Sequence, residues 1–265
     1  MFSYIGGKYR QAKWISKEFP KPIKRYAEVF GGAMWVYING NILADEVYYN
    51  DYNRQMVNLF ACCAQYETFL PYVNGVQAQN ESKFYEFRAD VLEANRNGIK
   101  MPDFDLAVKY VYLITQCFSG IVSENVKYVD LKGKYNSKYN SFSKRLNNPK
   151  IQTLLRKLQT HNQSYEDFIS EVDGEDTYLY VDPPYYGTEN LYAFHNFTTQ
   201  DHNLLADILN NIKSKWVLSY YDFPEMHEWY PEGKYRWERK EYKKASMASK
   251  KKKQSIGEEI IIIKE

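Results

Sequence analysis

The sequence of 265 residues lacks the features of several large protein classes. It has only three cysteines, Cys62, Cys63 and Cys117, without a CxxC pair, so we expect a reducing, intracellular setting and neither a disulfide framework nor structural zinc. No apolar run approaches the roughly 20 residues of a membrane helix, and the N-terminus has no signal-peptide core. The four histidines lack ligand spacing, so no metal is expected. His195 and His202 are predicted to lie in a loop and on a helix surface.

The sequence also lacks an overall excess of charge, because the formal net charge is only +2. Lysines are nevertheless concentrated in two segments, 127–145 and 243–254, and tyrosines are interleaved in the first. Lysines near aromatic rings suit a phosphate backbone with exposed bases, although a solvated loop explains either segment alone equally well. The nucleic-acid contacts that this pattern predicts are Lys127, Lys132, Lys134, Tyr135, Lys138, Tyr139, Lys250, Lys251 and Lys252.

What the sequence does contain is an alternation of strand and helix patterns, interrupted once. The first part predicts helices at 8–19, 31–40 and 54–66 and strands at 25–30 and 46–49. Helical patterns at 81–96 and 103–118 and a polar stretch, 119–148, follow without strand alternation. The last part predicts helices at 149–159, 198–213 and 224–230 and strands at 177–182, 215–220 and 258–265. This order indicates an α/β domain formed by 1–60 and 149–265, with a mainly helical insertion at 61–148.

Three of these helices have a cap signal at their start. Asn53 precedes the helix at 54–66 and can accept a hydrogen bond from its first turn. Asn148 stands before Pro149, a residue favoured at the first helical position. Thr198 and Asp201 have the spacing of a capping box. We therefore expect helices to begin at these three places.

The segment 177–187, TYLYVDPPYYG, places an aspartate and two prolines directly after a strand pattern. Two prolines cannot continue a sheet ladder, so the strand must end here in a rigid turn. At a strand's carboxyl end, where open α/β sheets bind ligands, the Asp182 carboxylate and the Pro183 carbonyl offer two fixed acceptors. They match the two hydrogens of an amino group on a flat ring, and Tyr185 offers a stacking surface. We favour a site over a simple turn, and we assign the next residue, Tyr186, to loop packing.

A second candidate site is the segment AEVFGGA, 27–33, in which a strand pattern runs into paired glycines at a helix start. Glycines let the backbone approach a ligand, with helix N–H groups available. Asp51 ends the next strand, where nucleotide-binding α/β folds place an acid for the ribose hydroxyls. Either feature alone fits an ordinary turn, but together they favour a nucleoside-containing cofactor. A dinucleotide or triphosphate is disfavoured, because the segment has neither GxGxxG nor a Walker lysine.

These motifs and their order resemble those of the DNA adenine-N6 methyltransferases of the Dam-like D12 class, over essentially the whole chain. YIGGKY at 4–9 is similar to that family's N-terminal motif, AEVFGGA to its S-adenosylmethionine loop, NDYN at 50–53 to its ribose-binding segment, and DPPY at 182–185 to its catalytic motif. The resemblance implies a Rossmann-like methyltransferase fold in which 61–148 is the target-recognition domain. It also implies methyl transfer to N6 of a flipped adenine in double-stranded DNA, by a cytoplasmic protein of a bacterial or phage-infected cell.

The resemblance also assigns roles to particular residues. The implied catalytic residues are Asp182, Pro183, Pro184 and Tyr185. The implied cofactor contacts are Tyr4, Gly7, Lys8, Glu28, Phe30, Gly31, Gly32, Asp51, Tyr165 and Asp182. Two regions depart from the family pattern. Met34 stands where the loop's last glycine is expected, and Ser123 and Glu124 stand near the place of a recognition arginine, so GATC specificity does not carry over.

The expected mechanism needs no metal. Hydrogen bonds from the adenine amine to the Asp182 carboxylate and the Pro183 carbonyl would make the nitrogen lone pair available and stabilise the developing positive charge. Two alternatives stay open, namely an RNA adenine methyltransferase and an inactive, cofactor-binding DNA-recognition module. Asp182 argues against a protein-glutamine methyltransferase, since those enzymes favour asparagine at this position. We expect the protein to act as a monomer, or as a dimer on DNA.

Overall fold

The computed structural model describes residues 1–265 except 77–79, 118–119, 121, 129–135, 187–196 and 244–255. Within the described residues, seven strands form one sheet in the order β3-β2-β1-β4-β5-β7-β6. Strands β1 to β5 are parallel, and β7 pairs antiparallel with both β5 and β6. The strands are β1 Ile23–Glu28, β2 Ala44–Asn50, β3 Leu158–His161, β4 Thr177–Val181, β5 Lys215–Tyr220, β6 Arg236–Lys243 and β7 Ile256–Lys264. This topology confirms the α/β, Rossmann-like fold class.

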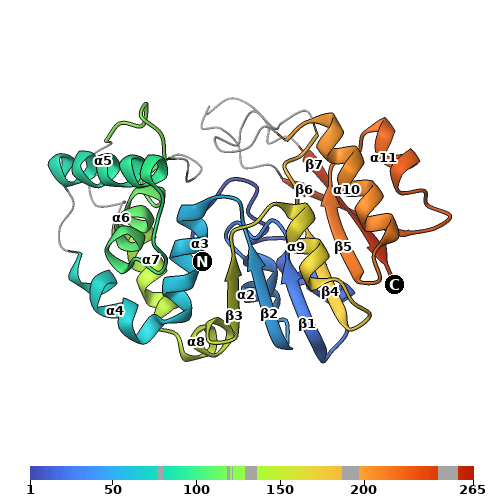
Figure 1. Cartoon of the computed structure of the whole chain (residues 1–265), viewed down its shortest axis with the longest axis horizontal. Helices are drawn as coiled ribbons and strands as arrows, with labels where there is room; N and C mark the ends of the chain where they lie inside the picture. Colours follow the sequence, from blue (N-terminus) through green and yellow to red (C-terminus); the bar gives the residue numbers. More distant parts are fainter. Residues whose placement is uncertain (77–79, 118–119, 121, 129–135, 187–196, 244–255) are drawn as a thin grey trace.

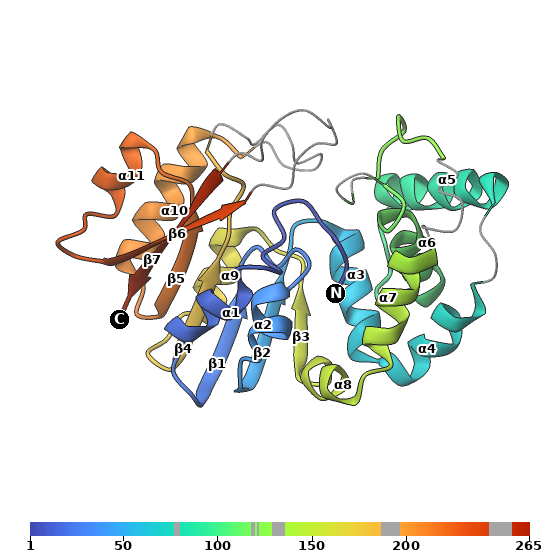
Figure 2. The ribbon, with the colours of Figure 1, turned by 180° about the vertical axis from the view of Figure 1, so that it is seen from behind.

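Helices cover both faces of the sheet. Figure 1 shows α9 and α10 over one face, and Figure 2, from behind, shows α1 and α2 over the other. The helices are α1 Ala12–Ile15, continued by the 3-10 helix η1 Ser16–Glu18, α2 Trp35–Gly40, α3 Arg54–Ala64, α4 Tyr66–Gly75, α5 Glu81–Asn97, α6 Phe104–Ile114, α7 Asn136–Leu146, α8 Pro149–Leu155, α9 Tyr165–Val172, α10 Thr199–Asn211 and α11 Pro224–Trp229.

The central strands are buried on both faces, as covered parallel strands are. On β7, Ile260 and Ile262 pack into the core under α9 and α10, whereas Ile261 and Ile263 pack into the core on the other face. Successive side chains of a strand point to opposite faces, so this run of isoleucines supplies both cores at once.

Helices α4 to α7 gather beside the sheet, next to α3 (Figure 1). Phe84 of α5 and Val111 of α6 belong to the same continuous core as Val47 of β2 and Phe60 of α3. The predicted boundary between residues 60 and 61 falls inside α3. The separation of 61–148 as a target-recognition domain therefore stays a prediction.

The three cap signals are confirmed. The Asn53 side chain accepts from the Gln55 amide at 3.0 Å, and Asn148 accepts from the Lys150 amide at 2.9 Å. Thr198 and Asp201 form a reciprocal capping box at the start of α10. Each bond satisfies an amide that would otherwise have no partner in the first turn, which fixes where these helices begin.

Several elements were not expected from the sequence. Strand β3 has only four residues, and β6 is a highly charged edge strand, so neither shows a clear strand pattern. The helices α4, α7 and α9 were also not predicted, and the helix expected over 8–19 is divided between α1 and η1.

The prediction for His202 is wrong, because this residue is fully buried on α10 and its Nδ1 forms a hydrogen bond with the Tyr220 hydroxyl. His195 lies outside the described residues.

Candidate active site

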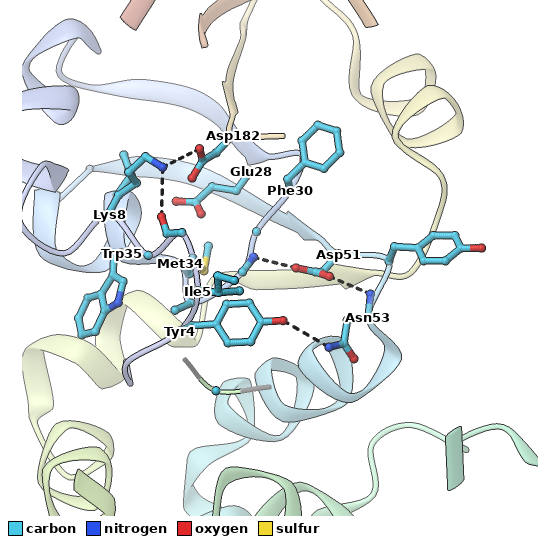
Figure 3. A pocket seen from close by; sticks show the side chains of 18 of the residues that line it. Tyr4, Ile5, Lys8, Glu28, Phe30, Met34, Trp35, Asp51, Asn53 and Asp182 are labelled. Atoms are coloured by element: carbon cyan, nitrogen blue, oxygen red, sulfur yellow. Dashed lines mark hydrogen bonds and ion pairs between the residues drawn. The ribbon is translucent and has the colours of Figure 1, made fainter. Parts of the chain in front are cut away.

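The carboxyl ends of three neighbouring parallel strands meet at one pocket (Figure 3). Strand β1 leads into the glycine loop, β2 into Asp51 and β4 into Asp182. The direction of strand order reverses between β1 and β4, and open α/β sheets bind ligands at such a point. The pocket encloses about 960 Å³ including its open mouth. The residues expected at the site that line it are Tyr4, Gly7, Lys8, Glu28, Phe30, Gly31, Gly32, Asp51, Asp182 and Pro184.

Both glycines of the loop are required by its geometry. A Cβ on Gly31 would stand 2.2 Å from the ring of Tyr49, and Gly32 has a φ of +47°. Met34, where the family pattern has a glycine, also has a positive φ of 54° and forms the N-cap of α2. The departure from the pattern therefore changes the side chain while the chain keeps the left-handed backbone that glycine favours.

Asp51 is held by the loop that it faces. Its Oδ2 accepts from the Gly32 amide and its Oδ1 from the Asn53 amide, both at 2.8 Å. Burial raises the pKa of Asp51 to about 6, and the two amide bonds oppose this rise. A carboxylate has about four acceptor positions, so Asp51 retains capacity for further donors such as a pair of ribose hydroxyls.

A second cavity, which also has Phe30 in its wall, includes Tyr165 and Gln163. The rings of Phe30 and Tyr165 lie 5.7 Å apart at 30°, and Phe197 contacts both. The buried Oε1 of Gln163 accepts no hydrogen bond from the described residues. Aromatic walls with an unused acceptor suit a flat, nitrogen-rich ring, and Phe30 and Tyr52 line both cavities. Tyr165 therefore belongs to this neighbouring cavity and not to the main pocket.

Asp182, the residue that follows β4, is paired with Lys8 of the N-terminal loop. The Lys8 ammonium donates to Asp182 Oδ1 at 2.8 Å and to the Gly6 carbonyl at 3.1 Å, as Figure 3 shows. Burial raises the pKa of Asp182, and the charge of Lys8 opposes the rise. The pairing brings together two expected site residues that are 174 positions apart in the sequence.

Tyr185 is buried beside this ion pair. Its ring meets Tyr221 edge-on with centroids 4.3 Å apart, and the Lys8 ammonium lies over it, 4.6 Å from the centroid. Its hydroxyl donates to Glu259 of β7. Tyr186 stacks on Phe223 with centroids 4.7 Å apart, which agrees with its assignment to loop packing.

Glu28, the last residue of β1, is a buried acid at the floor of the pocket. Its Oε1 accepts from the Tyr26 hydroxyl at 2.9 Å and from the Tyr37 amide at 3.0 Å. Burial nevertheless raises the pKa of Glu28 to about 8. At neutral pH the group is therefore mostly protonated and adds little charge to the pocket.

Sequence reasoning missed several residues of the site. Trp35, Asn53 and Tyr110 line the pocket, and Asn53 donates to the hydroxyl of Tyr110 at 3.2 Å. Glu259 is 2% exposed and lies 3.6 Å from the Lys8 ammonium. A carboxylate directly before four isoleucines of a buried strand is a signal that could have identified Glu259. Nothing in the local sequence identifies Tyr110, which reaches the pocket from α6.

The residues expected to contact DNA are only partly within the described chain. Lys127 and Lys138 are exposed, and Lys138 lines a groove that includes Arg145, Tyr9 and Trp35. Tyr139 is in the core, where its hydroxyl donates to the Val73 carbonyl at 2.9 Å, so we remove it from the expected DNA contacts. Lys132, Lys134, Tyr135, Lys250, Lys251 and Lys252 lie outside the described residues.

The described part of the chain contains no group of three or more histidine, cysteine or acidic side chains placed to hold a metal ion. None of its helices combines the length and apolar character of a membrane span. Cys62, Cys63 and Cys117 are buried and free.

The sheet, with an antiparallel β7 between β5 and β6, and the pocket at its switch point define an enzyme of the α/β methyltransferase class. More particularly, the chain belongs to the D12 class of N6 adenine-specific DNA methyltransferases, since that family's model matches residues 4–247. This membership confirms the adenine-specific, site-specific DNA methyltransferase activity expected from the sequence.

Three similar proteins illustrate the relationship. Type II methyltransferase M.CviBI of Paramecium bursaria Chlorella virus NC1A is 23% identical over 222 residues, which cover 81% of this chain and 80% of the relative. Type II methyltransferase M.FokI of Planomicrobium okeanokoites is 27% identical over 81% of this chain and 34% of its own length. Modification methylase StsI of Streptococcus sanguinis is 24% identical over 85% of this chain and 33% of its own length. The chain thus spans about a third of the last two relatives.

Proposed function

We propose that the protein transfers the methyl group of S-adenosylmethionine to N6 of an adenine that is flipped out of double-stranded DNA, as in restriction-modification. The observation that carries this proposal is the position of Asp182. It stands in a DPPY turn at the switch point of the sheet, and it borders the pocket that Asp51 and the glycine loop also line.

The pocket and its neighbouring cavity fit the parts of S-adenosylmethionine. Asp51 would accept from the ribose hydroxyls, and the rings of Phe30 and Tyr165 would enclose the adenine. The two glycines leave the loop backbone accessible, and Tyr4, Gly7, Lys8 and Glu28 complete the walls. The bound cofactor supplies a methyl group on a positively charged sulfonium. Every other contribution comes from side chains and backbone of this chain.

Asp182 and the Pro183 carbonyl would orient the target amine. The exocyclic nitrogen of adenine is a poor nucleophile, because its lone pair is delocalised into the ring. Two fixed acceptors favour a pyramidal nitrogen and stabilise the charge that develops on it. The proton leaves after transfer, since a neutral amine is too weak an acid to lose it first. Asp182 therefore acts by orientation and electrostatics, and it needs no proton transfer before the attack.

A flipped base loses a few kcal/mol of stacking and pairing, which contacts in the pocket must offset. The Lys8 ammonium that binds Asp182 also lies over the Tyr185 ring, which would contact the base once Lys8 has moved from its face. Exposed Lys127 and Lys138, together with the groove around Arg145, would contact the phosphate backbone.

The experiment uses S-adenosylmethionine labelled in its methyl group and unmethylated duplex DNA, with RNA as a parallel substrate. We expect label in DNA and none in RNA. Asp182→Ala should abolish transfer while the protein stays folded, and Asp176→Ala should retain it. Asp176 is an exposed acid just before the other end of β4, so it is a matched control. Label in RNA alone, or cofactor binding without any transfer, would favour the corresponding alternative.

A further inference from the structure

Glu259 is a buried carboxylate that the proposed mechanism does not use. It is 2% exposed on β7, whereas its neighbour Glu258 is exposed. A buried, unpaired carboxylate is strongly unfavourable, so its partners account for its presence. Those partners are the Tyr185 hydroxyl, which donates to Glu259 Oε1, and the Lys8 ammonium, 3.6 Å away. Both partners belong to the candidate active site.

Lys8 occupies the position that a target base would need. Its ammonium donates to Asp182 at 2.8 Å and lies over the face of the Tyr185 ring, 4.6 Å from the centroid. A flipped adenine would use the same carboxylate for its amine and the same ring for contact. The ammonium must therefore leave Asp182 when the base enters, and in this buried place its charge needs another carboxylate.

We propose that Glu259 is a positioning residue, which anchors the Tyr185 hydroxyl and receives the Lys8 ammonium when the amine of the target base replaces it on Asp182. This inference rests on the proposed function. Glu259 is already within 3.6 Å of the ammonium, so a small movement of the Lys8 side chain suffices. Without the charge of Glu259, Lys8 would stay on Asp182 and compete with the substrate amine. The residue acts through Lys8 and Tyr185 and does not touch the base itself.

The test is Glu259→Gln, which keeps an acceptor for Tyr185 but removes the negative charge. With labelled S-adenosylmethionine and unmethylated duplex DNA, we expect kcat to fall by roughly 10²-fold, the effect of a small misplacement of reacting groups. The KM for DNA and the affinity for S-adenosylhomocysteine should stay within about threefold of those of the unsubstituted protein, because neither involves Glu259 directly. Glu258→Gln removes the same charge one residue away on the exposed face, and it should leave kcat unchanged.

A second measurement tests whether Glu259 acts through Lys8. On a Lys8→Met background there is no ammonium to receive, so Glu259→Gln should change kcat by less than about twofold. If Glu259→Gln fails to fold, Tyr185→Phe carries the test, because it removes the hydroxyl that donates to Glu259. That variant should lose kcat and keep its affinity for S-adenosylhomocysteine.

Four outcomes would overturn the inference. They are an unchanged kcat in Glu259→Gln, an unchanged kcat in Tyr185→Phe where that variant carries the test, an equal loss on both Lys8 backgrounds, and a loss of kcat explained by lost cofactor binding. Absence of transfer by the unsubstituted protein would overturn the proposed function together with the inference. If the protein transfers methyl groups and Glu259→Gln leaves kcat unchanged, the inference alone is overturned.

Discussion

Three carboxyl groups border the pocket, and their surroundings set their protonation. Burial raises the pKa of Glu28 to about 8 and that of Asp51 to about 6. Burial also raises the pKa of Asp182, but the ammonium of Lys8 opposes this and favours the carboxylate. The Lys8 ammonium, 2.8 Å from Asp182, thus favours the carboxylate form that the proposed mechanism uses, while Glu28 remains mostly neutral at neutral pH.

The raised pKa of Asp51 predicts that cofactor binding depends on pH. If ribose hydroxyls donate to the ionised Asp51 carboxylate, as proposed, binding favours loss of the Asp51 proton. In the free protein this group is protonated below its pKa of about 6, so binding must then release a proton. We expect the affinity for S-adenosylhomocysteine to rise by roughly tenfold between about pH 5 and pH 7, measured by isothermal titration calorimetry.

Asp51→Asn is the control for that measurement. An amide does not titrate in this range and accepts less strongly, so the variant should bind more weakly at neutral pH and show a flat pH profile. If the variant keeps the full pH dependence, that dependence belongs to another group, such as Glu28 on the pocket wall. The ribose role of Asp51 would then be contradicted.

At the level of single residues, the sequence predicts those site residues that directly follow a strand. Asp51 and Asp182 were expected because each follows a strand pattern, and the parallel sheet brings both strand ends to one edge. Glu259 was not expected, since its partners lie far away in the chain, at Lys8 and Tyr185. Tyr139 was misplaced because burial of a tyrosine within a lysine-rich segment depends on the helices packed around it.

The same contrast appears at the scale of elements. Strongly patterned elements such as β4, β5 and α10 were expected, and α10 begins at its predicted cap. Strand β6 was not expected. Its many charged residues are typical of an exposed edge strand, and they give no apolar alternation. Helix α9 follows Ser164, whose side chain accepts from the Asp167 amide, so its start did have a local signal that was not used.

The junction between the glycine loop and α2 yields a stability prediction. Met34 is 1% exposed and has a left-handed backbone, so replacing it with glycine removes apolar burial and backbone strain together. Met34→Gly loses about 2–5 kcal/mol of packing and regains only about 1–2 kcal/mol of strain, so the free energy of unfolding should fall. Met34→Ala loses the packing and keeps the strain. In chemical denaturation, the free energy of unfolding should therefore be about 1 kcal/mol higher for Met34→Gly than for Met34→Ala.

That ranking reverses the usual order of the two residues. At an ordinary helical position, alanine is more stable than glycine by about 0.5–1 kcal/mol. Finding Met34→Ala to be the more stable of the two would mean that residue 34 leaves the left-handed region. The loop that faces Asp51 would then differ from the one described.

At the scale of the whole molecule, the net charge of +2 gives no general attraction for DNA. Binding must instead depend on where the positive charges lie. Lys138 lines a groove that adjoins the pocket. The two are neighbours because Tyr4, Gly7 and Trp35 belong to the walls of both. A phosphate backbone along this groove would bring the base-flipping site within reach of the duplex.

The salt dependence of DNA binding tests this placement. If Lys127 and Lys138 each neutralise one phosphate, their joint replacement by alanine should reduce the slope of log K against log salt by about 1.8, because each contact releases roughly 0.9 counterion. Fluorescence anisotropy with a labelled duplex gives the slope. The control is joint replacement of Lys21 and Lys213, which are exposed and precede β1 and β5 at the opposite edge of the sheet. The control should leave the slope unchanged, and equal effects of the two pairs would show that Lys127 and Lys138 have no special part in binding.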